Sequence, residues 1–240
     1  MNLLKIIDEN VFSEDLQTIN LEKKTIINTI NPHSFCVSKS DLLFQDALLE
    51  SDILLPDGSG IVLAAKILRG KVIKKIAGAD IHKHLLEHAE KEKKKVFYLG
   101  AAPSTLKLIE AKLKKEYPNI IVGSYSPPYK PEFSDQDSKK MIEETNNFGP
   151  DILFVGMTAP KQEKWVASNK NKLDATITVS IGAVFDFYAG TVERSSSFWI
   201  NIGLEWLPRL LKEPKRLWRR NFVSTPLFLW YLLKAKVSIN

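Results

Sequence analysis

Residues 95–116, KVFYLGAAPSTLKLIEAKLKKE, decide the fold class. An apolar run at 95–99 leads through a loop of small residues into an amphipathic stretch at 104–116. The same alternation of a short β-rich run and a helical pattern recurs up to about residue 190. Near-continuously apolar strands, each followed by a helix, are typical of a mostly parallel sheet covered on both faces. The sequence therefore predicts an α/β, Rossmann-like fold.

The patterns also predict where the individual elements lie. Strands are expected at 25–29, 52–55, 95–99, 120–124, 151–155 and 176–181. Helices are expected at 34–49, 59–68, 81–91, 104–116, 135–147 and 161–173. The segment YSPPYKP, 125–131, is too rich in proline for a central strand and is expected to be a surface loop.

Length and composition limit the class of protein. A chain of 240 residues with 44% hydrophobic and 26% charged residues is typical of one globular domain, with or without an appendage. The single cysteine, Cys36, excludes an internal disulfide framework and a cysteine-rich zinc site. The N-terminal segment MNLLKIIDENVF lacks the pattern of a secretory signal, so we expect a cytoplasmic protein.

The net charge of +6 is concentrated at the C-terminal end. Between Glu205 and Asn240 there are eight Lys or Arg residues and only two Glu, so the rest of the chain is neutral overall. Localised basicity indicates an anionic partner for this segment. We therefore predict an α/β catalytic domain at 1–194 and a C-terminal appendage at 195–240.

The appendage has the composition of an interfacial membrane anchor. It contains four of the five tryptophans, and its apolar run at 222–233 has twelve residues and is interrupted by Pro226. A spanning helix needs about 20 apolar residues, so the segment is expected to lie on a bilayer rather than cross it. Two alternatives are a contact with another protein, including a second copy of this chain, and nucleic acid. The abundance of Trp, Leu and Phe argues against nucleic acid.

Ligands of such sheets bind beyond the carboxyl ends of the strands. Thr29 and Asn31, at the end of the first strand, point the same way in an extended segment. Asn31 followed by Pro32 is also what a helix cap requires, and capping could be its whole role. Asp57, in the turn LPDGSG at 55–60, places a carboxylate at the same edge, where it could act as a general base. Most Pro-Asp-Gly turns have no further role.

Two more strand ends resemble ligand sites. Gly100 begins a small-residue loop that leads into a helix opening with Pro103 and Ser104, and such a helix N-terminus can hold a diphosphate. This loop is neither GxGxxG nor a P-loop. Farther along, Gln162 and Trp165 are one helical turn apart and could face one ligand, although Trp165 could equally be a core residue.

Metal sites have little support in the sequence. Asp135-Gln136-Asp137 has the letters of a metal-binding Asp-X-Asp motif, but it follows Ser134 at a predicted helix start, where acidic residues favour capping. The histidines at 82, 84 and 88 share one helical pattern without an HExxH glutamate, so a solvated helix face is expected instead. We predict no metal and no cofactor.

Five segments in this order resemble the WecG/TagA/CpsF family of bacterial glycosyltransferases. They are LPDGSG at 55–60, AGAD at 77–80, PKQEKW at 160–165, IGAVFDFYAG at 181–190 and GLEWLPRLLKEPKRLWRR at 203–220. The resemblance covers the chain from about residue 25 to residue 220. It implies a metal-independent, inverting transfer of a sugar from a UDP-sugar to a polyprenyl-diphosphate-linked amino sugar, in cell-surface polysaccharide or teichoic acid synthesis. The enzyme would work at the inner face of the cell membrane.

The resemblance also implies roles for particular residues. Asp57 resembles the general base that deprotonates the acceptor hydroxyl, with Thr29 and Asn31 as pocket residues around it. Gln162 resembles a sugar-nucleotide contact. Three arginines of the tail resemble groups that fold over the site and neutralise the diphosphate: Arg209, Arg216 and Arg219. Guanidinium groups suit this task, because departure of UDP builds negative charge.

One departure from the family leaves the donor sugar open. Many relatives have an arginine shortly before the Gly-X-Asp segment, where this chain has Lys75 ahead of Asp80; we expect both residues to bind substrate. Lysine keeps the charge but loses the bidentate fork. N-acetylmannosamine from its UDP-sugar to a polyprenyl-diphosphate-linked N-acetylglucosamine is the first expectation, with glucose or glucuronic acid as alternative donor sugars. A nucleotide-dependent oxidoreductase and a non-catalytic membrane adaptor are the alternatives from other classes.

Overall fold

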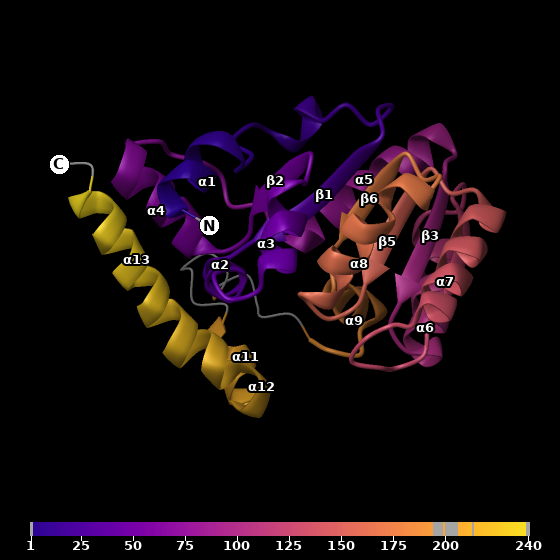
Figure 1. The fold of residues 1–240 in the computed structure, drawn as a ribbon. Helices are drawn as coiled ribbons and strands as arrows, with labels where there is room; N and C mark the ends of the chain where they lie inside the picture. The colour runs from indigo at the N-terminus through magenta and orange to yellow at the C-terminus, as the bar shows by residue number, and fades with distance from the viewer. Residues whose placement is uncertain (1, 194–198, 200–205, 213, 239–240) are drawn as a thin grey trace.

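The computed structural model describes residues 2–193, 199, 206–212 and 214–238. Its centre is one sheet of six parallel strands in the order β2-β1-β6-β5-β3-β4 (Figure 1). The strands are β1 (Thr25–Ile30), β2 (Ile53–Pro56), β3 (Lys95–Gly100), β4 (Ile121–Tyr125), β5 (Ile152–Gly156) and β6 (Ile177–Ser180). All six strands predicted from the sequence are therefore confirmed to within one residue at each end, as is the parallel α/β fold.

Helices cover both faces of the sheet. The first half of the chain contributes α1 (Leu3–Glu9), α2 (Pro32–Ser38), α3 (Leu42–Leu49), α4 (Ser59–Arg69) and α5 (Gly78–Glu92). The second half contributes α6 (Pro103–Glu116), α7 (Asp135–Phe148), α8 (Lys161–Asn169) and α9 (Val184–Ala189). Short 3-10 turns lie at Leu16–Thr18 and Lys170–Lys172.

Some predicted helices differ in extent: α5 begins at Gly78 instead of 81, and α8 ends at Asn169 instead of 173. The helix expected at 34–49 is two helices, because α2 ends at Ser38 and Asp41 caps a new helix by accepting a hydrogen bond from the Phe44 N–H at 3.0 Å. Asp41 is an N-cap residue in extended conformation, so the chain turns there instead of continuing one helix.

Three groups of buried side chains hold the layers together. The first lies between the sheet and α5, α6 and α9, and the second lies between the sheet and α7 and α8. The third joins α1 to α4 with the edge strand β2 and includes two residues of the C-terminal segment, Phe228 and Leu232. Thus part of the predicted appendage packs into the core of the predicted catalytic domain.

The C-terminal segment is helical where the structure describes it. It contains α11 (Trp206–Lys212), α12 (Pro214–Trp218), a π-helix at Arg219–Ser224 and α13 (Thr225–Val237). Helix α13 runs along α1, α2 and α4 at the side of the molecule where β2 lies (Figure 1). Among the described helices, none combines the length and apolar character needed to cross a membrane. The predicted boundary at 194/195 lies outside the described residues.

Candidate active site

The carboxyl ends of the parallel strands bring the predicted site loops to one edge of the sheet. In the order of the strands, the residues that follow are Asp57 after β2, Asn31 after β1, Ile181 after β6, Met157 after β5 and Ala101 after β3. Strand β1 leads to β2 on one side, whereas the chain later returns on the other side of β1, through β6. Such a reversal of strand order is where parallel α/β sheets bind ligands.

Asp57 and Asn31 lie beside each other at neighbouring strand ends. Ile30 is aligned with Pro56, and the Asp57 N–H donates to the Ile30 carbonyl at 2.8 Å. Gly58 has a φ of 96°, and a Cβ placed there would be 3.9 Å from the Asn31 Cβ. The half-buried Asp57 carboxylate therefore sits at the rim of the sheet next to Asn31, as the sequence predicts. Its role as a base stays a prediction.

Asn31 has a structural role that the sequence also predicts. Its Oδ1 accepts hydrogen bonds from the backbone N–H groups of His33 and Ser34, both at 3.0 Å, and the Ser34 hydroxyl accepts from the Asn31 N–H at 2.8 Å. This capping box fixes the start of α2. The Asn31 Nδ2 group makes neither bond. Thr29, aligned with Leu55 and half-buried, lies two residues before it.

Lys75 and Asp80 lie next to the end of β2. The Ile76 N–H donates to the Pro56 carbonyl at 3.0 Å, which holds the segment containing Lys75 against this strand. Asp80 is exposed, and its Oδ2 accepts from the Ala77 N–H at 2.8 Å, so the carboxylate caps α5. Lys75 therefore lies near the strand end that carries Asp57, whereas Asp80 lies in the first turn of α5, and the contact of both with substrate stays a prediction.

Position 100 requires glycine because the backbone there lies very close to the backbone at Gly156. The φ of Gly100 is 126°, and a Cβ there would lie 2.4 Å from the Gly156 carbonyl oxygen. The Ala101 N–H donates to that same oxygen at 3.1 Å. Helix α6 then begins at Pro103 with no side-chain cap from Ala102. This helix N-terminus faces the same edge as Asp57, where its N–H groups can attract a diphosphate.

Gln162 is buried in the first turn of α8. Its Oε1 accepts from the Met157 N–H at 3.1 Å, and its Nε2 donates to the Glu163 carboxylate at 2.9 Å. The amide therefore braces the turn between β5 and α8, and its contact with a sugar nucleotide stays a prediction. Trp165 is a core residue whose indole N–H donates to the Ser138 hydroxyl at 3.3 Å. The reading of Trp165 as core is thus confirmed.

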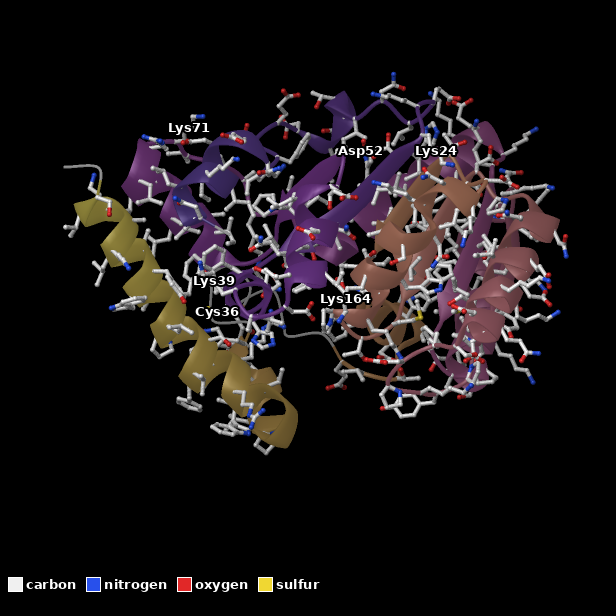
Figure 2. All side chains as sticks on the ribbon, viewed as in Figure 1. Lys24, Cys36, Lys39, Asp52, Lys71 and Lys164 are labelled. Atoms are coloured by element: carbon white, nitrogen blue, oxygen red, sulfur yellow. The ribbon has the colours of Figure 1, made fainter. Side chains whose placement is uncertain are left out.

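The C-terminal segment docks directly beside these loops. The His33 Nδ1 lies 2.8 Å from the Ser224 hydroxyl, and the Cys36 thiol donates to the Ser224 carbonyl at 3.3 Å. A Cβ on Gly60 would lie 2.4 Å from the Pro32 Cγ and 3.5 Å from the Phe228 ring, so these three residues form one contact. Figure 2 shows Cys36 and Lys39 on the side of α2 that faces α13.

Lys39 makes a further contact with the tail. Its Nζ lies 5.3 Å from the centroid of the Tyr231 ring on α13. Of the three arginines predicted to bind the diphosphate, Arg219 is exposed, and its guanidinium lies 5.7 Å from the centroid of the Trp218 ring. The side chains of Arg209 and Arg216 lie outside the described part of the structure.

The predicted helix-capping role of the acidic segment 135–137 is confirmed. Asp137 caps α7 reciprocally with Ser134 and pairs with Lys130 at 2.8 Å. These hydrogen bonds, that from Lys130 first, lower the pKa of Asp137 to about 2. Within the described ranges, no three His, Cys, Asp or Glu side chains gather as a metal site would require.

The prediction of a solvated histidine face is wrong for His82. This residue is buried, and its Nε2 lies 2.7 Å from the Tyr98 hydroxyl. Burial, together with the charge of Lys112, lowers the pKa of His82 to about 3, so the ring is neutral. The helical spacing alone could not show that one of the three positions turns toward the sheet.

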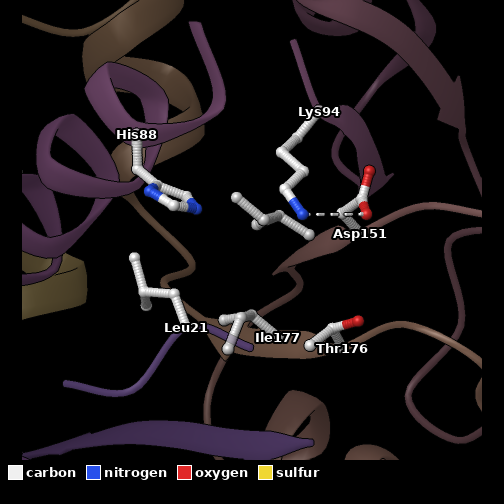
Figure 3. A pocket seen from close by; sticks show the side chains of 7 residues that line it. Leu21, His88, Lys94, Asp151, Thr176 and Ile177 are labelled. Carbon is white, nitrogen blue, oxygen red and sulfur yellow. Dashed lines mark ion pairs between the residues drawn. The ribbon is translucent and has the colours of Figure 1, made fainter. Parts of the chain in front are cut away.

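A small cavity lies away from the site. It is lined by Leu21, His88, Lys94, Asp151, Ile152, Thr176 and Ile177, at the amino ends of β5 and β6 (Figure 3). Lys94 and Asp151 form an ion pair of 3.8 Å across one side of it. The cavity lies at the edge of the sheet opposite to Asp57, so it is not part of the candidate site.

Comparison with known proteins identifies the family. The profile of the glycosyl transferase WecG/TagA/CpsF family matches residues 4–240, which is nearly the whole chain. The chain belongs to this family. As a WecG/TagA/CpsF protein it is a glycosyltransferase, as the five sequence motifs predict.

Individual relatives in the family are similar over most of their length. A protein of Bacillus subtilis named N-acetylglucosaminyldiphosphoundecaprenol N-acetyl-beta-D-mannosaminyltransferase is 33% identical over 211 residues, covering 88% of this chain and 80% of the relative. Proteins with the same name are 31% identical in Bacillus spizizenii, over 98% of this chain and 90% of the relative, and 27% identical in Staphylococcus aureus, over 95% and 88%.

Three residues at the candidate site of this WecG/TagA/CpsF glycosyltransferase could not be predicted from the sequence: His33, Ser224 and Glu163. His33 follows Asn31-Pro32, but its partner Ser224 is 191 positions away, and no local pattern connects them. Glu163 lies inside the motif PKQEKW, where a surface helix would also have a glutamate, so its burial gives no sequence signal. These contacts depend on tertiary packing alone.

Proposed function

We propose that the protein transfers N-acetylmannosamine from its UDP-sugar to a polyprenyl-diphosphate-linked N-acetylglucosamine, for cell-surface polysaccharide or teichoic acid synthesis. The observation that carries this proposal is the position of Asp57 beside Asn31 at neighbouring strand ends, in a chain of this family. The names of the relatives supply the donor and acceptor chemistry. UDP-glucose and UDP-glucuronic acid are the alternative donors, because Lys75 stands where many relatives have arginine.

The proposed reaction is a single inverting displacement. The acceptor hydroxyl oxygen attacks C1 of the donor sugar while the Asp57 carboxylate takes its proton. The bond from C1 to the diphosphate breaks, and its electron pair leaves with UDP. Because attack and departure occur on opposite faces, an α-linked donor gives a β-linked product. One carboxylate is sufficient for this chemistry.

The leaving diphosphate needs stabilisation as its charge grows. We assign this task to Arg219, with Arg209 and Arg216, and to the N–H groups at the start of α6. Arg219 belongs to the π-helix that ends at Ser224, and Ser224 contacts His33 beside the Asn31 cap. The connection from Arg219 through Ser224 to the Asp57 region supports a role of the tail in completing the site.

The tail also has the surface expected of a membrane contact. Helix α13 buries Phe228 and Leu232 against the body, whereas other large apolar side chains remain exposed on it and on the preceding π-helix. These exposed residues are Phe222, Val223, Leu227, Leu229, Trp230, Leu233 and Val237. Basic residues flank them, including Arg219 and Lys234. Apolar and basic groups together favour an anionic bilayer surface, so we place the enzyme peripherally on the inner face of the cell membrane.

A donor panel tests the proposed function. The full-length protein is incubated with a short-chain polyprenyl-diphosphate N-acetylglucosamine and one UDP-sugar at a time, with EDTA present, and UDP release is measured. We expect the N-acetylmannosamine donor to be turned over fastest. Turnover of none of the donors would argue for a non-catalytic adaptor, and turnover only after a divalent cation is restored would contradict the metal-free mechanism.

A further inference from the structure

Three buried polar side-chain atoms lack a hydrogen-bond partner among the described residues. Two belong to neighbouring strands and one to a helix that packs on the sheet. They are the Asn28 Oδ1 on β1, the Ser180 Oγ on β6 and the Glu163 Oε2 on α8. Their residues are 1%, 1% and 3% exposed, respectively. Buried polar atoms are nearly always hydrogen-bonded, so three of them in one layer call for a common explanation.

The strand register places Asn28 and Ser180 side by side. Ile27 is aligned with Val179 in the parallel pair β1–β6, and Asn28 and Ser180 are the next residue on each strand. Ile27 and Val179 point to the core under α5 and α6, so their successors point to the opposite face, where α3 and α8 lie. Asn28 confirms this direction, because its Nδ2 donates to the Ser51 hydroxyl at the end of α3 at 2.8 Å.

Glu163 lies on the same side of the sheet, in the first turn of α8. Helix α8 packs against both β6 and α3, and Glu163 is in its first turn, near the carboxyl end of β6 where Ser180 lies. One carboxylate oxygen, Oε1, accepts from the Gln162 Nε2 at 2.9 Å. The other oxygen, Oε2, is the unpartnered one. We name Gln162, Glu163, Ser180, Asn28 and Ser51 the polar row.

The number of hydrogen-bond donors in the polar row depends on the protonation state of Glu163. With Glu163 ionised, its Oε2 and the Asn28 Oδ1 are both acceptors, and the single hydroxyl proton of Ser180 can serve only one of them. With Glu163 neutral, the Oε2–H supplies a second donor. Ser180 then accepts from Glu163 and donates to Asn28, and all three atoms gain a partner.

We propose that Glu163 is held as a neutral acid whose proton orders the polar row, so that Glu163 acts as a positioning residue for Gln162 and the turn after β5. The row then connects the Met157 N–H, through Gln162, to β6, β1 and α3. The consequence for catalysis rests on the function proposed above; the protonation state does not.

The charged surroundings agree with a neutral acid. Burial raises the pKa of Glu163 to about 7, against a smaller lowering by the Gln162 hydrogen bond. On α8, Lys164 is paired with Asp41 of α3 at 2.9 Å, and the Lys161 Nζ donates to the Lys130 carbonyl at 2.7 Å. The strands contribute uncharged side chains to this face, Asn28, Thr178 and Ser180. Both neighbouring lysines therefore have other partners.

The sign of the pH dependence follows from this shift. The folded-state pKa lies above the ordinary value of 4.5, so the native state binds more protons than the unfolded state between the two values. Stability is therefore greatest below the ordinary pKa and is lost as the pH rises through about 7.

The polar row matters for the site because Gln162 separates two of its loops. A Cβ on Gly182, in the turn after β6, would lie 3.3 Å from the Gln162 Oε1 and 3.4 Å from the Met157 carbonyl. A displaced Gln162 amide would therefore shift the turns after β5 and β6 together. These turns lie between the Asn31 end of the site and the Gly100 end.

Two substitutions at one position test the proposal. Glu163→Gln keeps the shape and places an NH₂ donor where the acid has its proton, whereas Glu163→Ala removes the connection. The exposed Glu143→Gln is the control for loss of a carboxylate. Infrared difference spectra, thermal unfolding from about pH 5 to about pH 8, and kcat and KM are measured on the full-length proteins.

We expect the infrared band of a protonated carboxyl group in the wild type at pH 6, its loss in Glu163→Gln, and its retention in Glu143→Gln. Glu163→Gln should unfold at a temperature that no longer falls with rising pH and should retain most of the wild-type kcat. Glu163→Ala should lose at least about tenfold in kcat, with a smaller change in KM. An ionised Glu163 at pH 6, or a Glu163→Gln variant as impaired as Glu163→Ala, would overturn the proposal. If no variant has transferase activity, the proposed function fails, while the infrared and unfolding results still decide the protonation of Glu163.

Discussion

The His33 Nδ1 lies 2.8 Å from the Ser224 hydroxyl, although the two residues are 191 positions apart in the chain. His33 is the second residue of α2, whose start is fixed by Asn31, and Ser224 ends the π-helix that carries Arg219. The pair therefore connects the C-terminal segment to the loop beside Asp57. Burial, together with the charge of Arg220, lowers the pKa of His33, which favours the neutral ring in this contact.

The first prediction concerns this contact. Ser224→Ala should leave the half-buried His33 ring nitrogen without its partner, at a cost of about 1–3 kcal/mol. We expect faster hydrogen exchange across 219–237 and a reduced kcat, with exchange in the sheet unchanged. Ser238→Ala is the matched control, because the Ser238 hydroxyl donates to the Lys234 carbonyl at the exposed end of the same helix. Equal exchange in both variants would show that the Ser224 hydroxyl does not hold the tail.

The second prediction concerns the proposed base. Asp57→Asn keeps the size of the side chain but removes the proton acceptor, so kcat should fall by about 10²- to 10⁴-fold. Donor affinity, measured by UDP-sugar titration, should change little. Asp46→Asn, on the exposed face of α3, is the control for the loss of one carboxylate. An Asp57→Asn enzyme with near wild-type kcat would assign the base to another residue.

The third prediction concerns membrane attachment. Phe222 and Leu233 are 64% and 66% exposed, so replacing both by Ser should leave the packing of α13 intact. Each loss removes up to about 1.5–3 kcal/mol of apolar burial in the bilayer, which lowers binding to anionic liposomes at least about tenfold. Leu108→Ser, on the exposed face of α6, is the control and should bind as the wild type does. Undiminished sedimentation of the double variant with liposomes would refute this docking face.

The fourth prediction concerns the backbone contact under the candidate diphosphate site. Gly100→Ala combines a φ of 126° with a Cβ 2.4 Å from the Gly156 carbonyl oxygen, so it should lower the free energy of unfolding by more than about 3 kcal/mol. Gly70→Ala has a positive φ of 67° but no atom within 4 Å, and it should cost only about 1–2 kcal/mol. Urea unfolding measures both. Equal losses would mean that the turn at Gly100 can relax.

Much of the fold was accessible from sequence because its signals are local. The apolar strands are short and continuous, and β1 ends at Ile30 just before the Asn31 cap and Pro32. Asp57 could be predicted at the rim because a carboxylate that follows a buried parallel strand has to lie at the carboxyl edge. The break between α2 and α3 was missed although the sequence carries a signal for it, because the polar run 38–41 ends in Asp41, a favoured N-cap residue.

The long-range part of the site could not be predicted in the same way. The sequence predicts an appendage at 195–240, but it does not show that Phe228 and Leu232 are buried among residues of α1, α2 and α4. Which residues of an apolar helix face the body depends on the surface they meet, and the tail is apolar on several sides. The burial of Glu163 depends likewise on the packing of α8 against α3 and β6.

The configuration of the product tests the central claim most directly. Wild-type enzyme is incubated with the UDP-linked N-acetylmannosamine donor, polyprenyl-diphosphate N-acetylglucosamine and EDTA, and the new glycosidic linkage is assigned by NMR. The account predicts a lipid-linked disaccharide with one β-linked N-acetylmannosamine, formed at least about 10²-fold more slowly by Asp57→Asn. An α-linked product, or a product that forms only when a metal ion is added, would contradict it.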